Sequence, residues 1–125
     1  MIPSDIDRDA PVIVKRDRVI EAPIEPLWGL HLDIAQWPAW QKDIVTASLD
    51  SPLAVGISFT WSTAGLDTPI VSTIYAIEPQ RDTLWGGPSA GIVGIHSWLF
   101  EATGMRTRVI TEESWSGAAV EAKPA

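Results

Sequence analysis

The chain has 125 residues, of which 46% are apolar and 20% charged, with a net charge of −7 and no cysteine. This length suits one domain with a sizeable core, and the composition is that of a globular protein. The acidic balance argues against nucleic-acid binding and against stable association with an anionic membrane. The lack of cysteine excludes disulfides and thiolate chemistry.

The N-terminal residues 1–10, MIPSDIDRDA, predict a mobile arm and lack the apolar core that a signal peptide needs. No apolar run in the sequence approaches the length of a membrane span. Together these features predict a cytoplasmic protein.

The first regular element is a strand over residues 12–22, in which mixed apolar and charged side chains alternate. Residues 22–40 then form the only stretch with a helical pattern, because Leu27, Leu30 and Ile34 recur at three- and four-residue spacing. Trp28 and His31 fall on a neighbouring face of this helix.

The end of the helical stretch is expected at Trp37-Pro38-Ala39-Trp40, because a residue before proline is disfavoured in the α region. The rest of the sequence predicts strands joined by short turns. The expected strands are residues 44–49, 57–63 and 69–78, a short one opening at Leu84, and residues 92–102 and 106–115. Residues 86–91, GGPSAG, predict a flexible loop between two of them.

In this order and spacing, several segments resemble one known family. They are APIEPLW, Asp33 followed by WPAW, the strand after Gly56 with Phe59 and Trp61, IEPQRDTLW, and HSWLFEATGMRTRVITEESWSG. The sequence resembles the START/Bet v 1-like superfamily, in its polyketide cyclase/dehydrase and lipid-transport (SRPBCC) branch, over about residues 11–117.

The resemblance implies an α+β helix-grip fold, in which a curved antiparallel sheet of about seven strands wraps a long C-terminal helix, with two short helices after the first strand that close one end. It also implies an apolar cavity closed by a long C-terminal helix. The sequence ends where that helix should begin, after a tail of residues 118–125. We therefore expect either a truncated form or a homodimer or partner chain that completes the cavity.

Seven of the ten aromatic residues are tryptophan. Buried tryptophans need partners for their ring N–H groups, so this bias suits a cavity wall for a small apolar or aromatic molecule, although core packing is the simpler reading for any one of them. The expected ligand-binding residues are Trp28, Trp37, Trp40, Phe59, Trp61, Trp85, Trp98, Phe100, Thr111 and Trp115.

Three polar residues are candidates for proton transfer. His96 shares a strand face with Trp98, and Glu113 shares one with Trp115, so both are expected to point inward. Tyr75 is the third candidate. The alternative for His96 is a core histidine bonded to a carbonyl or to the Tyr75 hydroxyl, and a slip of one residue would exchange Glu113 for Glu112.

No cofactor or metal is expected. His31 and Asp33 are two residues apart and do not face each other on a helix, and no other cluster has ligand spacing. The GGPSAG segment lacks the lysine of a phosphate-binding loop.

Three functions stay open from the sequence. The first is a cyclase or dehydratase that folds an apolar carbonyl substrate and moves protons on it. The second is a non-catalytic carrier of a hydrophobic small molecule. The third is an interaction module that uses an open sheet face. The inward tryptophans favour a ligand pocket over a plain interface, but they hardly separate enzyme from carrier.

Overall fold

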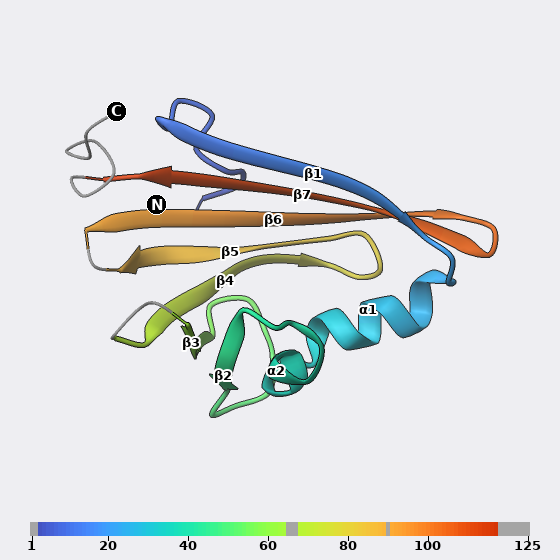
Figure 1. The fold of residues 1–125 in the computed structure, drawn as a ribbon, viewed down its shortest axis with the longest axis horizontal. Helices are drawn as coiled ribbons and strands as arrows, with labels where there is room; N and C mark the ends of the chain where they lie inside the picture. The colour runs from blue at the N-terminus through green and yellow to red at the C-terminus, as the bar shows by residue number, and fades with distance from the viewer. Residues whose placement is uncertain (1–2, 65–67, 90, 118–125) are drawn as a thin grey trace.

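The computed structural model describes residues 3–64, 68–89 and 91–117. Its seven strands form one antiparallel sheet in the order β1-β7-β6-β5-β4-β3-β2, which curls around the helical segment (Figure 1). This α+β, helix-grip-like architecture confirms the predicted fold class. The elements are β1 (Val12–Ile20), α1 (Ile24–Leu32), η1 (Ile34–Gln36), α2 (Trp37–Trp40), β2 (Ile44–Ser48), β3 (Ser58–Thr63), β4 (Ile70–Glu78), β5 (Asp82–Ser89), β6 (Ile92–Thr103) and β7 (Arg106–Ser116).

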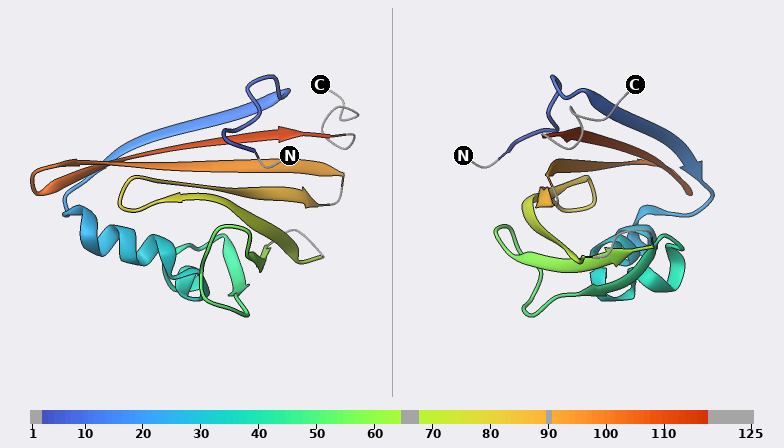
Figure 2. Two further views of the ribbon diagram at one scale, coloured as in Figure 1. Left: turned by 180° about the vertical axis from the view of Figure 1, so that it is seen from behind. Right: turned by 60° about the vertical axis from the view of Figure 1, so that its left-hand side comes forward.

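The helical segment joins the two edges of the sheet. Strands β2 to β7 pair in sequence order, and β1 adds to the free side of β7 over all nine of its residues. The chain must therefore pass from β1 at one edge to β2 at the other, and α1 and α2 lie along that path (Figures 1 and 2). This connection places the helices against the concave face. Within the described residues, which end at 117, no helix follows β7.

The buried face of α1 differs from the predicted one. Ile24, Trp28 and His31 are buried, whereas Leu30 is 49% exposed. These three residues follow the i, i+4, i+7 spacing of one helix face. The Trp28 ring decides which face of α1 is buried, because it packs edge-on against Phe100 of β6 with 5.3 Å between ring centroids.

The helical segment ends at Trp40, as predicted, but the residue before Pro38 is not forced out of the α region. Trp37 has α-helical dihedral angles (φ −53°, ψ −40°) and begins α2, with Pro38 in the first turn, where no intrahelical N–H is needed. Tertiary contacts override the local preference, since the Trp37 ring is buried and its Nε1–H donates to the His31 carbonyl at 3.0 Å.

The prediction of a loop over residues 86–91 is wrong, because β5 continues to Ser89. Gly86 pairs with Thr73 of β4 and with Ile95 of β6. A Cβ atom at Gly86 would strike the Gly94 carbonyl oxygen and would lie 2.9 Å from the Ile95 Cα. The glycine here allows close approach of neighbouring strands, and the turn lies further on, where Gly91 has a φ of +79°.

The N-terminal arm, which the sequence predicts to be mobile, packs on the convex face of the sheet. Ile6 is buried against Leu84 and Ile95. The Asp7 amide donates to Ser114 Oγ at 2.9 Å, and Arg8 donates to both carboxylate oxygens of Glu112. The convex face thus has its own apolar cluster, separate from the two that fill the concave face.

None of the helices among the described residues is long and apolar enough to cross a membrane.

The glycine at position 86 gives a direct test of this packing. We expect Gly86→Ala to destabilise the fold by about 2 kcal/mol or more, because its Cβ meets rigid backbone atoms. Gly29→Ala is the matched control, since Gly29 is an exposed helical position with no neighbour within 4 Å, and alanine should stabilise it by about 0.5–1 kcal/mol. Urea unfolding followed by tryptophan fluorescence measures both, and equal effects would contradict the close approach of β5 to β6.

Candidate functional site

The concave face carries a continuous group of aromatic rings. His96, Trp98 and Phe100 alternate along β6 and therefore point to one side, opposite Thr83 and Trp85 of β5. The ring centroids of Trp85 and His96 are 4.8 Å apart, and those of His96 and Trp98 are 5.4 Å apart. Alternation on adjacent strands is thus what gathers these side chains.

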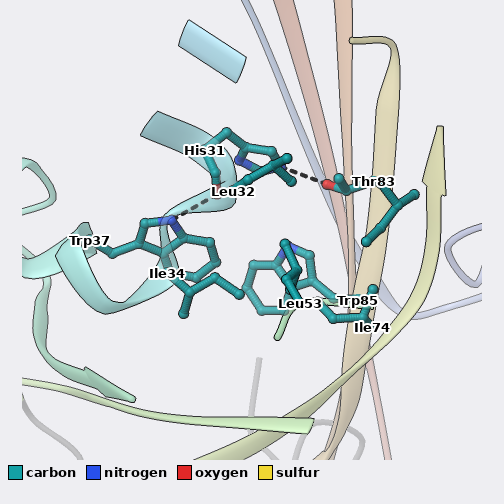
Figure 3. A pocket seen from close by; sticks show the side chains of 9 residues that line it. His31, Leu32, Ile34, Trp37, Leu53, Ile74, Thr83 and Trp85 are labelled. Atoms are coloured by element: carbon teal, nitrogen blue, oxygen red, sulfur yellow. Dashed lines mark hydrogen bonds between the residues drawn. The ribbon is translucent and has the colours of Figure 1, made fainter. Parts of the chain in front are cut away.

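The helical segment closes one part of this face. Trp37 packs edge-on against Phe59 at 5.5 Å and lies 5.7 Å from Trp85, while His31 lies 4.7 Å from Trp98. A small cavity of about 10 Å3 remains between the helical segment and the sheet (Figure 3). Its walls are His31, Leu32, Ile34, Trp37, Leu53, Ile74, Ile77, Thr83 and Trp85.

His96 and Glu113 form a close pair across β6 and β7. They occupy directly opposed positions, and His96 Nδ1 lies 3.3 Å from Glu113 Oε2. The two atoms are at contact distance but are not aligned as a hydrogen bond. Such contacts often become aligned only when a ligand binds. Glu112 points to the convex side and pairs with Arg8, so the structure places Glu113, and not its neighbour, beside His96.

Burial controls the protonation of both members of this pair. It lowers the pKa of His96 to about 4, because the charged imidazolium loses its water. Burial also raises the pKa of Glu113, against the opposing effects of a hydrogen bond from the Trp115 side chain and of the Arg16 charge. At neutral pH the imidazole is therefore an uncharged proton acceptor with a carboxyl group beside it.

Tyr75 lies on the other side of the sheet, so its predicted place beside His96 and Glu113 is wrong. The pairing of β4 with β5 shifts between Ile74 and Ala76, and Tyr75 is the extra residue at this bulge. Its side chain packs with Leu84 and Ile95 in the convex cluster.

The expected ligand-binding residues divide into three groups. Five are buried and pack the interior, namely Trp28, Trp37, Phe59, Trp85 and Phe100. Three are partly exposed, namely Trp61, Trp98 and Thr111. Two are exposed: Trp40, at 41%, and Trp115, at 38%. Trp115 lies next to Gly94 of β6, which leaves room for its ring: a Cβ there would lie 3.8 Å from Trp115 Cδ1.

His31 is the site residue that the sequence analysis did not identify. It is 4% exposed, and its Nε2 lies 2.7 Å from Thr83 Oγ1. Burial, together with a smaller effect of the nearby His96, lowers the pKa of His31 to about 3. The i, i+4, i+7 spacing of Ile24, Trp28 and His31 could have shown that His31 lies on the buried face of the helix.

The described residues contain no group of three or more His, Asp or Glu side chains arranged to hold a metal ion. Asp33 is exposed at the end of α1, on a different side of the chain from buried His31.

Comparison with known proteins identifies one family. The family described as "Polyketide cyclase / dehydrase and lipid transport" matches residues 11–124. No curated protein matches the chain significantly.

Several solved structures share the fold at low sequence identity. A START superfamily protein from Mycobacterium smegmatis has a TM-score of 0.73 and 11% identity, with 85% of this chain and 77% of that chain covered. The ZhuI aromatase/cyclase from Streptomyces sp. R1128 has a TM-score of 0.70 and 12% identity, with 86% and 68% covered. Norcoclaurine synthase from Thalictrum flavum, in complex with dopamine and hydroxybenzaldehyde, has a TM-score of 0.66 and 7% identity, with 83% and 68% covered.

His31, which is buried, and His96, which is partly buried, predict a specific pH dependence of stability. Their folded-state pKa values, about 3 and about 4, lie below the ordinary value of 6.5, so the unfolded chain binds protons that the folded chain does not. The histidines therefore make their full contribution to the free energy of unfolding above about pH 6.5. Below that pH the contribution falls, by about 1.4 kcal/mol per pH unit for each histidine.

Urea unfolding between pH 6.5 and pH 5 measures this slope above the range where most carboxylates titrate. His96→Gln should remove about half of it. An unchanged slope in this variant would contradict the neutral, buried state of His96.

Proposed function

Because the chain belongs to the polyketide cyclase/dehydrase and lipid transport family, we propose that its concave face binds a flat apolar or aromatic molecule and that His96 and Glu113 move a proton on it. The observation that carries this proposal is the 3.3 Å contact between His96 Nδ1 and Glu113 Oε2 among aromatic rings. A purely structural core has no need of two titratable groups at that position.

The accessible part of the aromatic face suits such a ligand. Trp98, Trp61 and Thr111 are partly exposed, and Trp115 is exposed on the same side as Glu113. Indole rings bind flat molecules by stacking and edge contacts, and each such contact adds about 0.5–1.5 kcal/mol beyond the area that it buries. The Thr111 hydroxyl supplies one polar contact that can orient the ligand.

The pair has the properties that a cyclisation followed by loss of water requires. Neutral His96 accepts a proton from the carbon beside a carbonyl group, and that carbon then forms a bond to a second carbonyl carbon. The resulting imidazolium gives its proton to the alkoxide that forms from the second carbonyl group, which becomes a hydroxyl group. The neutral imidazole then accepts the second proton of the same carbon and returns it to this hydroxyl group, which leaves as water while a carbon–carbon double bond forms. Glu113, when ionised, stabilises the imidazolium between the two steps.

The names of the similar structures agree with this proposal. One is an aromatase/cyclase, and another was solved with two aromatic molecules, dopamine and hydroxybenzaldehyde. At 12% and 7% identity these likenesses establish the fold alone, so the chemistry rests on His96 and Glu113.

A carrier function is the second candidate, and the packing of the interior favours it. The cavity between the helical segment and the sheet measures only about 10 Å3, so a ligand must lie on the open part of the face or move side chains to enter. Binding by shape alone needs no proton transfer. The exposed Trp115 also leaves room for a second copy of the chain or a partner chain over the ligand.

Two isosteric variants separate the enzyme from the carrier. We expect His96→Gln and Glu113→Gln each to lower the rate of cyclisation of a small tetraketide thioester by about 100-fold or more, because each removes a proton-transfer group. Binding of the substrate should change less than about threefold. Mass spectrometry of the products measures the rate, relative to the reaction without protein, and calorimetry measures binding.

Tyr75→Phe is the matched control, because Tyr75 lies on the convex face and should affect neither quantity. Binding without any acceleration over the protein-free reaction would make the protein a carrier. Absence of binding would refute both functions.

A further inference from the structure

The arginines of this chain differ in whether they have an acidic partner. Four of the six form ion pairs with an aspartate or a glutamate, namely Arg8, Arg81, Arg106 and Arg108. Within residues 3–64, 68–89 and 91–117, the other two, Arg16 and Arg18, form no such pair. The chain has 16 acidic residues and 9 basic ones, so acidic partners are not scarce. These two guanidinium groups are therefore available to an anion from outside the described chain.

Arg16 and Arg18 belong to the concave face of the sheet, at its β1 edge. In β1, Ile20 packs into the concave cluster that contains Val109. Because side chains alternate along a strand, Arg18 and Arg16 point to the same side as Ile20. Burial raises the pKa of Glu113 and the charge of Arg16 opposes that rise, which agrees with a position of Arg16 beside Glu113. The two arginines thus face the same side as the proposed ligand site.

Strand pairing places Arg16 in line with an aromatic ring. Arg16 is directly opposite Thr111 of β7, and Thr111 is directly opposite Trp98 of β6. These three strands lie next to one another (Figure 1). Adjacent strands are about 4.8 Å apart, so the backbones at Arg16 and Trp98 are about 10 Å apart. An aromatic ring that lies on Trp98 therefore has a guanidinium group within reach of a substituent that points toward β1.

The chemistry of the two side chains defines that substituent. Guanidinium groups bind carboxylates through two parallel hydrogen bonds and stay charged at every physiological pH. Both arginines are exposed, so they can turn toward a ligand without loss of core packing. A cationic substituent would be repelled at this edge. The end of the ligand that meets β1 is therefore expected to be anionic.

We propose that Arg16 and Arg18 form an anion-binding edge of the concave face, and that the ligand is an aromatic molecule with a carboxylate group. This inference rests on the proposed function, because it names the charged end of the same ligand. The two arginines act as specificity residues. They hold the carboxylate over β1 while the ring lies on Trp98, whose centroid is 5.4 Å from that of His96.

Calorimetric titration with 2-naphthoate and 2-naphthamide tests this inference, because the two molecules share one ring system and differ in charge. At pH 7 and low salt we expect the native protein to bind 2-naphthoate at least about tenfold more tightly. The net charge of −7 disfavours any anion, so such a preference has to come from a local site. Raising the salt concentration to about 0.5 M should weaken the preference.

Replacement of the arginines by glutamine should remove the preference. We expect Arg16→Gln to lower the ratio of the two dissociation constants about threefold, and the double variant with Arg18→Gln to bring the ratio close to one. Binding of 2-naphthamide should stay unchanged in both variants. Because both side chains are exposed, the variants should fold as the native protein does.

Lys15→Gln is the matched control for Arg16→Gln. It removes one positive charge from the same strand, but Lys15 lies opposite Glu112, whose side chain is on the convex side. The ratio of the two dissociation constants should therefore stay at the native value. An equal loss in Lys15→Gln and Arg16→Gln would overturn the inference, because the overall charge and not the concave edge would then determine the preference.

The remaining outcomes separate this inference from the proposed function. Equal binding of 2-naphthoate and 2-naphthamide by the native protein would overturn the anion-binding edge and leave the proposed function intact. A preference that persists in the double variant would also overturn it. If neither molecule binds, the proposed function and the anion-binding edge both fail.

Discussion

The packing of the Trp85 ring is the constraint on which the rest of this structure depends. Trp85 lies on β5, the fourth of seven strands in the sheet, and its ring contacts three elements that are far apart in sequence. Its centroid is 5.7 Å from Trp37 of α2, 5.4 Å from Phe59 of β3 and 4.8 Å from His96 of β6. The curl of the sheet brings β3 and α2 to the same ring. The short helices have too few residues to be stable alone, and burial of these aromatic surfaces offsets the conformational entropy that is lost when they form.

This packing also determines the electrostatics of the candidate site. His31 and His96 are enclosed by rings that offer them little hydration, so the uncharged form of each is favoured. An imidazole that is neutral at physiological pH is able to accept a proton. The chemical property that we propose for this face therefore has the same origin as its stability.

The sequence predicted those parts of the fold in which side-chain alternation is regular. Along β6 and β7 the two-residue period is unbroken, and it places His96 and Glu113 on one face, as expected. The prediction failed at Tyr75, because its neighbour Ile74 faces the concave side opposite Trp85, which leaves Tyr75 on the convex side. It failed at Gly86 because glycine indicates a loop by composition but serves here to let β5 approach β6. It failed at His31 because the helix pattern was assigned to its leucines, whereas the contact of Trp28 with Phe100 sets which face is buried.

The same alternation explains how two adjacent glutamates come to have opposite properties. Glu112 faces the convex side, where a hydrogen bond from Arg8 holds the pKa of its carboxyl below the ordinary value. Glu113 faces the concave side, where burial raises the pKa of its carboxyl. Enzymes commonly separate the roles of two carboxyl groups by giving them such different environments.

Here the N-terminal arm contributes to that separation, because it brings Arg8 to Glu112 and so fixes one carboxylate on the outer surface. A shift of β7 by one residue would place Glu112 beside His96 and expose Glu113. The pairing of Arg8 with Glu112 therefore helps to keep the strand in the register on which the His96–Glu113 pair depends.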